Sequence, residues 1–243
     1  MLIKFISVTS PLEIMDILEN IDELILKLEN LRTRLIYDSS YPTVSFIFFH
    51  YLPKFQFKNK FILIFSETIC RGLEKVHRSL LKYSTDVSEI LKDVRIIKIG
   101  KNYDVPFGEL YEFIPYDEIE DGFARIEHTF KKLKGDDLLI FFGMHLIPVI
   151  YGREILRGLM ELYDAIPRDI TLLSTCPEHI YDKNLETIIR MFYDIVLRIK
   201  KEDELFRFGR DTYLIGVEQS SIPEIKPRFG RYIIDSTGRF IRV

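Results

Sequence analysis

The residues best placed by type and spacing to do chemistry are Cys176 and His179, in the run Cys176-Pro-Glu-His179 after an apolar segment. A thiol and an imidazole three residues apart could supply half of a tetrahedral metal site. No second pair of ligands stands at such a spacing, because Cys70 is the only other cysteine and the other histidines are isolated. We therefore expect a structural cysteine and a surface histidine, with no metal or other cofactor.

The common catalytic signatures are missing from the sequence. It contains no G-x-S-x-G, H-E-x-x-H or C-x-x-C motif and no EF-hand loop. Serine-hydrolase, zinc-protease and calcium chemistry are therefore not indicated. Glu67 and His145 follow apolar runs, at the place where parallel sheets hold ligand-binding residues. Either residue could be catalytic or structural.

The composition describes one large globular domain or two small ones. The chain has 243 residues, of which 47% are hydrophobic, with 12 glycines and 2 cysteines. These values exclude a disordered, collagen-like or disulfide-framed protein. Two cysteines also fit a reducing compartment, so we expect a cytoplasmic protein.

Charge and hydropathy exclude two further classes. A formal net charge of −3 argues against a dedicated nucleic-acid binder. No apolar run approaches the roughly 20 residues that span a bilayer, and no signal-peptide cleavage pattern follows the N-terminus. Only Gln56 and Gln219 are glutamines, while Ile, Lys and Glu abound, a balance associated with proteins of very hot environments.

Short apolar runs alternate with helical patterns along most of the chain. Strands covered on both faces are predicted at Thr33–Tyr37, Phe61–Phe65, Val94–Ile99, Leu138–Phe142, Thr171–Ser174 and Ile195–Ile199. Helices are predicted at Pro11–Leu28, Thr43–Leu52, Cys70–Tyr83, Asp117–Leu133, Tyr151–Ile166 and Lys183–Asp194. This alternation predicts an α/β fold, with a mostly parallel central sheet and helices on both faces.

The C-terminal segment departs from this alternation. Tyr213–Glu218 and Arg231–Ile234 have the composition of strands, and Ser236-Thr237-Gly238 precedes Arg239–Val243 as a hairpin turn would. We therefore predict antiparallel strands at this edge of the sheet. No linker or internal repeat divides the chain. Residues 1–243 are predicted to form a single domain, with an N-terminal strand and helix (1–30) and C-terminal hairpins (213–243).

The order of these elements resembles the RecA superfamily, specifically the archaeal KaiC-like and RadA-like ATPases. Leu35–Leu52 is similar to the strand, phosphate loop and helix of that family, and Lys60–Leu73 is similar to its second strand. Asp137–Leu146 is similar to the Walker B strand, and the run after Tyr232 is similar to the closing hairpin. The resemblance implies a three-layer P-loop NTPase fold with antiparallel strands at the C-terminal edge.

The phosphate loop of that family is changed here. Its pattern is G-x-x-x-x-G-K-[ST], because glycines let backbone N–H groups surround the phosphates and lysine neutralises them. In the matching window Asp38 and Thr43 replace the glycines and Val44 replaces the lysine, while Ser45 keeps its type. In an unrelated α/β protein the same window would be an ordinary loop before a helix capped by Ser39 or Ser40.

Two other positions of the family also differ. The Walker B strand should end in an aspartate that holds magnesium, and here it ends in Phe142. KaiC-like hexamers carry a Lys-x-Arg pair that reaches a neighbour's nucleotide, where this chain has Glu218 and Ser220. Losing the lysine and the loop contacts removes on the order of 5 kcal/mol, which takes a micromolar nucleotide site to about millimolar. We expect a monomer or homodimer instead of a nucleotide-driven hexamer.

The sequence favours a non-catalytic RecA-like domain that has lost ATP binding and binds a protein or peptide partner. A cleft without its anion-binding charge favours apolar side chains over phosphates. The candidate cleft residues are Asp38, Ser39, Ser40, Thr43, Val44, Ser45, Glu67, Phe142 and His145. One alternative is a divergent nucleotide-binding ATPase that uses Ser45, Glu67 and His145 or Glu178. The other is a recombinase-like accessory protein that binds nucleic acid through Arg190–Arg210 and the basic C-terminus.

Overall fold

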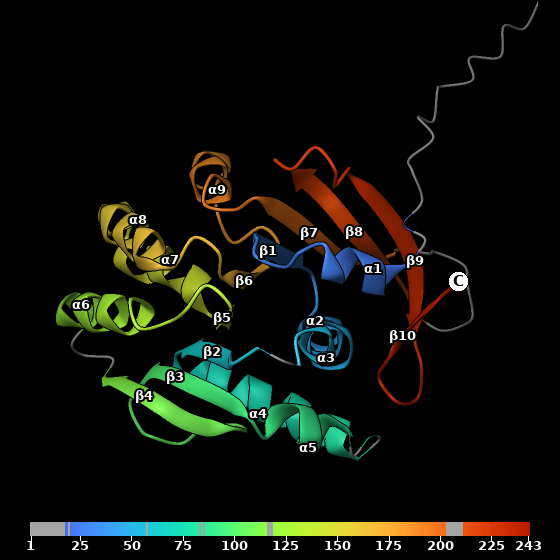
Figure 1. Ribbon diagram of the computed structural model, residues 1–243, viewed down its shortest axis with the longest axis horizontal. Coiled ribbons are helices and arrows are strands. Elements are labelled where there is room, and N and C mark those ends of the chain that lie inside the picture. Colours follow the sequence, from blue (N-terminus) through green and yellow to red (C-terminus); the bar gives the residue numbers. More distant parts are fainter. Residues whose placement is uncertain are drawn as a thin grey trace, which may run out of the picture.

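The computed structural model describes Leu18 and residues 20–56, 58–82, 84, 86–115, 119–202 and 211–243. Its strands form one sheet in the order β10-β9-β8-β7-β1-β6-β5-β2-β3-β4 (Figure 1). The parallel strands are β1 (Arg32–Tyr37), β2 (Lys60–Phe65), β3 (Val94–Gly100), β4 (Glu109–Pro115), β5 (Leu138–Phe142), β6 (Thr171–Pro177) and β7 (Ile195–Lys201). The antiparallel strands β8 (Thr212–Ser220), β9 (Arg228–Ile234) and β10 (Phe240–Arg242) extend the sheet beyond β7.

Helices cover both faces of the sheet (Figure 1). One face carries α1 (Ile21–Leu26), α2 (Ser40–Phe46), α3 (Leu52–Lys54), α4 (Glu67–Leu81) and α5 (Asp86–Leu91). The other carries α6 (Ile119–Phe130), α7 (Ile147–Tyr151), α8 (Leu156–Ala165) and α9 (Lys183–Arg190). Among the described helices none is both long and apolar enough to cross a membrane.

The central strands are apolar throughout because both of their faces are covered. Every residue of β2 and of β5 is buried. Side chains alternate between the two apolar layers, so Ile62 and Ile64 face the layer of α1–α5 while Leu63 and Phe65 face that of α6–α9. The structure is therefore the three-layer α/β architecture that the sequence predicts.

The predicted strands that fall within the described residues are confirmed, while strand β4 and helices α5 and α7 lie outside the sequence prediction. The six apolar runs form β1, β2, β3, β5, β6 and β7, and the C-terminal runs form β8 to β10 with the hairpin turn before Phe240. The unpredicted strand β4 is the sheet edge, and its burial alternates because one face meets solvent. The unpredicted helix α5 is only six residues long, too short for its periodicity to stand out.

Several predicted helix boundaries differ from the structure. The predicted helix Tyr151–Ile166 is interrupted at Gly152, whose φ of 81° ends α7, and α8 begins only at Leu156. The predicted helix Asp117–Leu133 ends earlier, at Phe130 of α6, and its first two residues lie outside the described part of the chain. Most of the predicted N-terminal strand and of the helix Pro11–Leu28 lies outside the described residues, which show α1 at the end of that range.

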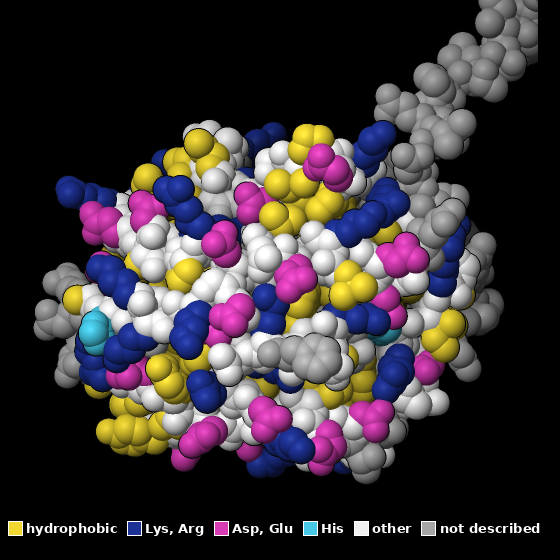
Figure 2. Space-filling model, in the orientation of Figure 1, with side chains coloured by type: hydrophobic (Ala, Val, Ile, Leu, Met, Phe, Trp, Pro, Cys, Tyr) yellow, Lys and Arg dark blue, Asp and Glu magenta, His cyan; other side chains and the backbone are white. Residues whose placement is uncertain are grey.

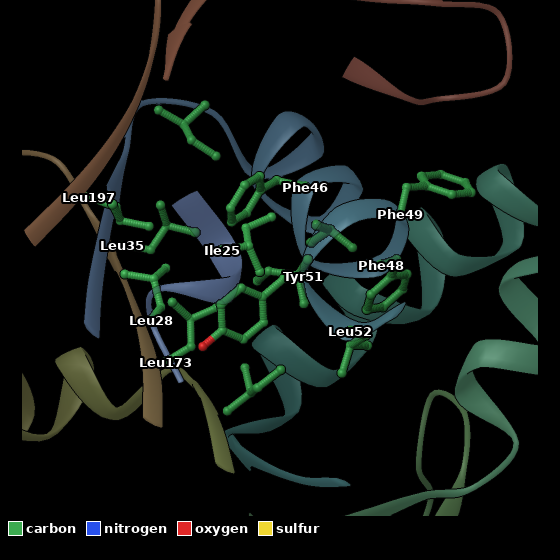
Figure 3. Close-up of a cluster of buried hydrophobic side chains, with 14 of the residues drawn as sticks. Ile25, Leu28, Leu35, Phe46, Phe48, Phe49, Tyr51, Leu52, Leu173 and Leu197 are labelled. Carbon is green, nitrogen blue, oxygen red and sulfur yellow. The ribbon is translucent and has the colours of Figure 1, made fainter. Parts of the chain in front are cut away.

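One continuous helical segment after β1 fixes the architecture next to the candidate cleft. It consists of α2, a π-helical turn (Ile47–Tyr51) and α3, and it begins at Ser40, earlier than the predicted Thr43. Figure 3 shows this segment directing apolar side chains toward α1 and the sheet, where Ile25, Leu28, Leu35, Phe46, Tyr51, Leu173 and Leu197 form one buried cluster. This packing holds the start of α2 against the end of β1.

Replacing Tyr51 with phenylalanine is expected to raise the free energy of unfolding by about 1 kcal/mol. The Tyr51 side chain is fully buried, and its hydroxyl has no hydrogen-bond partner among the described residues, so removing the hydroxyl removes an uncompensated desolvation cost. Tyr193→Phe is the matched control, because the Tyr193 hydroxyl contacts that of Tyr163 and its removal should destabilise. Guanidinium unfolding followed by circular dichroism measures both, and a destabilised Tyr51→Phe would contradict the expectation.

Candidate functional site

A cleft of about 390 Å³ opens at the carboxyl ends of β1, β5 and β6, with α2 on one side and α4 on the other. This is the edge at which open α/β sheets hold their ligands. The lining residues are Tyr37, Ser40, Thr43, Val44, Thr68, Ile69, Gly72, Leu73, Lys75, Val76, Phe142, Gly143, His145 and Thr175. The walls are mostly apolar, and Lys75 is the one lining lysine or arginine among the described residues.

Five of the nine predicted cleft residues line this cleft: Ser40, Thr43, Val44, Phe142 and His145. They come from α2, the end of β5 and the turn after it. Four others, Asp38, Ser39, Ser45 and Glu67, are not among its lining residues. The structure thus brings together the apolar members of the predicted set and directs several polar members elsewhere.

The window that matches a phosphate loop is mostly helical. Only Asp38 and Ser39 separate the end of β1 from the start of α2 at Ser40. A phosphate loop needs the whole run between its two glycines as a loop, so that successive N–H groups point at the anion. Pro42 lies in the first turn of α2, where its missing N–H costs no helical hydrogen bond. The window therefore does not have the loop conformation of a phosphate-binding motif.

The polar ends of the same window are bound to other parts of the fold. The Asp38 carboxylate accepts a hydrogen bond from the backbone N–H of Lys201 at 2.7 Å. The Ser45 side chain is fully buried, and its hydroxyl donates to the carbonyl of Gly238 in the C-terminal hairpin. Ser39 occupies the N-cap position of α2 without a side-chain capping bond. The hydroxyl of Ser45, which would hold magnesium in a phosphate loop, is used for tertiary packing.

Glu67 is held in an ion pair on the far side of its helix from the cleft. Its carboxylate lies 3.1 Å from the ammonium of Lys98, whose side chain is fully buried, and accepts a 2.8 Å hydrogen bond from the N–H of Lys101. Burial works against the charged carboxylate, but the N–H of Lys101 and the ammonium of Lys98 outweigh it and lower the pKa of Glu67. A carboxylate with a lowered pKa and fixed partners is poorly suited to act as a general base.

The strand that matches Walker B carries no carboxylate at its carboxyl end. Phe142 ends β5 and lines the cleft. The acidic residue beside this strand, Asp137, lies at the opposite end, where it accepts hydrogen bonds from Asn59 and from the N–H of Lys134. Within the described residues no group of three or more His, Cys, Asp and Glu side chains could hold a metal ion.

His145 is the buried polar residue at the base of the cleft. Its Nδ1–H donates to the carbonyl of Thr175 at 3.1 Å, which leaves Nε2 as an acceptor. Burial, assisted by the positive charge of Arg34, lowers the pKa of His145 to about 4. The imidazole is therefore neutral at physiological pH. It can accept a hydrogen bond from a ligand but carries no charge for an anion.

The fold matches solved structures of archaeal proteins. The chain matches the KaiC-like protein PH0186 from Pyrococcus horikoshii OT3 with a TM-score of 0.57 and 12% identity, over 88% of this chain and 90% of that one. It matches the flagellar accessory protein FlaH from Methanocaldococcus jannaschii with a TM-score of 0.50 and 12% identity, over 91% and 95% of the two chains. The chain has a RecA-like fold.

A third structure agrees with this RecA-like fold. It is the protein PH0250 of Pyrococcus horikoshii OT3, with a TM-score of 0.55 and 14% identity over 85% of this chain and 96% of that one. No protein-family model matches the sequence, and neither does any curated protein. At these identities the similarity establishes the RecA-like fold alone.

The contacts of the buried residue Arg34 help to explain why Cys176 and His179 do not form a metal site. On the RecA-like central strand β1, Arg34 is 1% exposed and donates to Glu186 at 2.8 Å and to the Cys176 sulfur at 3.0 Å. Burial raises the pKa of the Cys176 thiol, although Arg34 opposes this rise. His179 is an exposed side chain. The two residues do not converge on a metal site.

The basic surface of the second alternative is largely neutralised where it is described, and on the face seen in Figure 2 basic and acidic side chains are interspersed. Arg198 pairs with Glu178 and Glu218, and Arg190 pairs with Glu186 and Glu218. Glu218, at the first position of the family's Lys-x-Arg pair, is thus a member of an alternating ion-pair chain. Residues 203–210 lie outside the described part of the chain.

Sequence reasoning missed the wall of the cleft that α4 supplies. Ile69, Leu73 and Val76 follow one another at helical spacing on this wall, with Thr68, Gly72 and Lys75 beside them. The signal was present in the helical pattern of Cys70–Tyr83, but an apolar helical face does not reveal whether it meets the core or an open cleft.

Replacing Gly72 with alanine is expected to raise the free energy of unfolding by about 0.5–1 kcal/mol. A Cβ at Gly72 would meet no atom within 4 Å, so alanine improves helix propensity without a clash. Gly158→Ala within α8 is the matched control variant, because a Cβ added at Gly158 would make only ordinary contact with Phe123 at 3.5 Å. Thermal and guanidinium unfolding of both variants measure the gain. A destabilised Gly72→Ala alone would show that the space beside α4 is filled.

Proposed function

We propose that this protein is a non-catalytic RecA-like domain whose cleft binds apolar side chains of a protein partner instead of nucleotide. The observation that carries the proposal is the start of α2 at Ser40, which turns the phosphate-loop window into a helix. A nucleotide site depends on backbone N–H groups at that place. Here a helix replaces the loop that would carry these groups around the phosphates, and this supports the loss of ATP binding.

The chemistry of the cleft walls supports apolar binding. Val44, Ile69, Leu73 and Phe142 replace the charged and glycine-rich surface that phosphates require. The polar groups of the lining other than Lys75 are neutral, since burial raises the pKa of the Tyr37 hydroxyl to about 12 and lowers that of His145. Such groups can orient a peptide by hydrogen bonds while the walls supply the affinity.

The positions that would perform phosphoryl transfer support a non-catalytic role. Transfer depends on a lysine, a magnesium-holding carboxylate and a positioned base. Val44 and Phe142 stand at the first two positions, and Glu67 is bound to Lys98. Without the nucleotide that joins RecA-like subunits, we propose a monomer or homodimer.

Isothermal titration with ATP and Mg²⁺ tests the loss of nucleotide binding directly. We expect no saturable heat below about 1 mM nucleotide, because losing the lysine and the loop donors costs on the order of 5 kcal/mol. A dissociation constant in the micromolar range would overturn the proposal. The variant Gly72→Leu, which fills the open space beside α4, is the control: any heat that it abolishes comes from this cleft.

A further inference from the structure

We infer that the partner segment bound in this cleft is acidic, with large apolar side chains flanked by carboxylates that pair with Arg71 and Lys75. This inference rests on the proposed function and adds the charge of the partner to it. Three features of the cleft carry it: its volume, the unpaired cations on α4, and the lack of opposing charge on the α2 side.

The volume of the cleft limits the size of the apolar side chains that a partner can insert, which we call the anchor. A cleft of about 390 Å³ is larger than one side chain needs and lies at the lower end of the range for ligand pockets. The open space next to Gly72 lets an anchor approach the α4 backbone closely. A short segment that inserts large apolar side chains fits this space, as in other grooves that recognise peptides.

Helix α4 carries two exposed cations next to the cleft. Lys75 lines the cleft, and Arg71, which is not one of its lining residues, lies one helical turn before it. Neither has a hydrogen-bond or ion-pair partner within the described part of the chain. The charged side chains of Glu67, Glu74 and Arg78 on α4 already form ion pairs, because Glu67 pairs with Lys98 and Glu74 pairs with Arg78. Two cations beside an apolar wall are therefore available to a partner.

The opposite rim offers no carboxylate to neutralise these cations. Ser40 and Tyr37 stand there, and Asp38, the residue after Tyr37, accepts the N–H of Lys201. The described lining of the cleft contains no carboxylate, and Glu74 on α4 is paired with Arg78, so carboxylates of a partner would meet the unpaired cations of α4. Rim charges of this kind mainly select partners and accelerate association, while the buried apolar anchors supply most of the affinity.

A selection from a random peptide library identifies the partner chemistry without assuming a sequence. Twelve-residue random peptides displayed on phage are selected on the whole wild-type protein, with counter-selection on Gly72→Leu. We expect the enriched peptides to carry two large apolar residues next to Asp or Glu. A synthetic copy of the most enriched peptide is then measured by fluorescence anisotropy.

Charge reversal tests the two cations. The double variant Arg71→Glu/Lys75→Glu should weaken binding of that peptide about tenfold at low salt and less at high salt. The double variant Lys132→Glu/Arg168→Glu makes the same charge change at exposed positions away from the cleft and should leave the affinity unchanged. Circular dichroism confirms that each variant is folded.

The outcomes separate the two proposals. Enriched peptides without acidic residues, or equal affinity for wild type and Arg71→Glu/Lys75→Glu, would overturn this inference and leave the apolar binding function in place. If no peptide is enriched on wild type over Gly72→Leu, the proposed binding function itself fails.

Discussion

Replacing Glu67 with leucine is expected to lower the free energy of unfolding by about 3–5 kcal/mol, the cost of leaving a buried charge without its partner. The Lys98 side chain is fully buried, and its ammonium donates to Glu67, to the Asn102 side chain at 2.6 Å and to the carbonyl of Asp104 at 2.6 Å. Without Glu67 the ammonium keeps two neutral acceptors and no counter-charge. Desolvation of the lysine is then uncompensated.

A double-mutant cycle separates the interaction free energy between Glu67 and Lys98 from the contributions of their other contacts. The double variant Glu67→Leu/Lys98→Met should recover part of the lost stability, since removing both charges also removes the desolvation cost. Guanidinium unfolding monitored by circular dichroism gives the four free energies. An exposed pair on the same helix, Glu74 with Arg78, is the matched control, and Glu74→Leu should cost less than about 1 kcal/mol. Equal effects at the two glutamates would show that Glu67 is not held by a buried charge.

The Glu67 result also bears on the ATPase alternative. A catalytic glutamate is tuned for function, so its replacement commonly leaves stability unchanged or improves it. A large loss of stability would identify Glu67 as a structural residue of the β2–α4 junction. If Glu67→Gln instead lowered a measurable rate of phosphate release, the divergent ATPase would be supported.

Acidification from pH 7 to pH 5 is expected to destabilise the wild type by about 2 kcal/mol through His145 alone. Burial lowers the pKa of His145 to about 4, while an unfolded histidine titrates near 6.5. Between these values the unfolded chain binds the proton and the folded chain does not. The stabilising effect is therefore complete above about pH 6.5 and is lost as the pH falls toward 4.

The measurement compares wild type with His145→Gln, which can still donate to the Thr175 carbonyl. The difference in unfolding free energy between the two proteins should shrink or reverse as the pH falls, and His179→Gln, at an exposed histidine, serves as the control. Burial also lowers the pKa values of His50 and His77, so each protein retains a residual slope. Parallel curves for wild type and His145→Gln would contradict the assignment.

Much of the fold was predictable from the sequence because its strands are buried on both faces. Runs such as Phe61–Phe65 and Leu138–Phe142 contain no polar residue, and only a covered parallel sheet accommodates them. Edge strand β4 escaped prediction for the opposite reason: Glu109 and Tyr111 are exposed, and its pattern resembles that of a loop with scattered apolar residues. Local patterns identify buried elements better than exposed ones.

The candidate site was predictable in place but only partly in composition. The sequence located it after β1 and β5, and Val44 and Phe142 do line the cleft. It placed Ser45 and Glu67 there as well, although their partners are Gly238 and Lys98, which are distant in sequence. Side-chain direction depends on such tertiary contacts, and residue type alone does not encode them.

Periodicity and residue identity are local properties, so the layered α/β architecture and the absence of the phosphate-binding residue types could be inferred from the amino-acid sequence. Long-range packing was needed to establish that α2 begins at Ser40 and that α4 supplies an apolar wall with Lys75 beside it. The start of a helix depends on what its first turn packs against. Whether an apolar helical face closes a core or opens a cleft depends on the distance to the next helix, which is set by long-range packing.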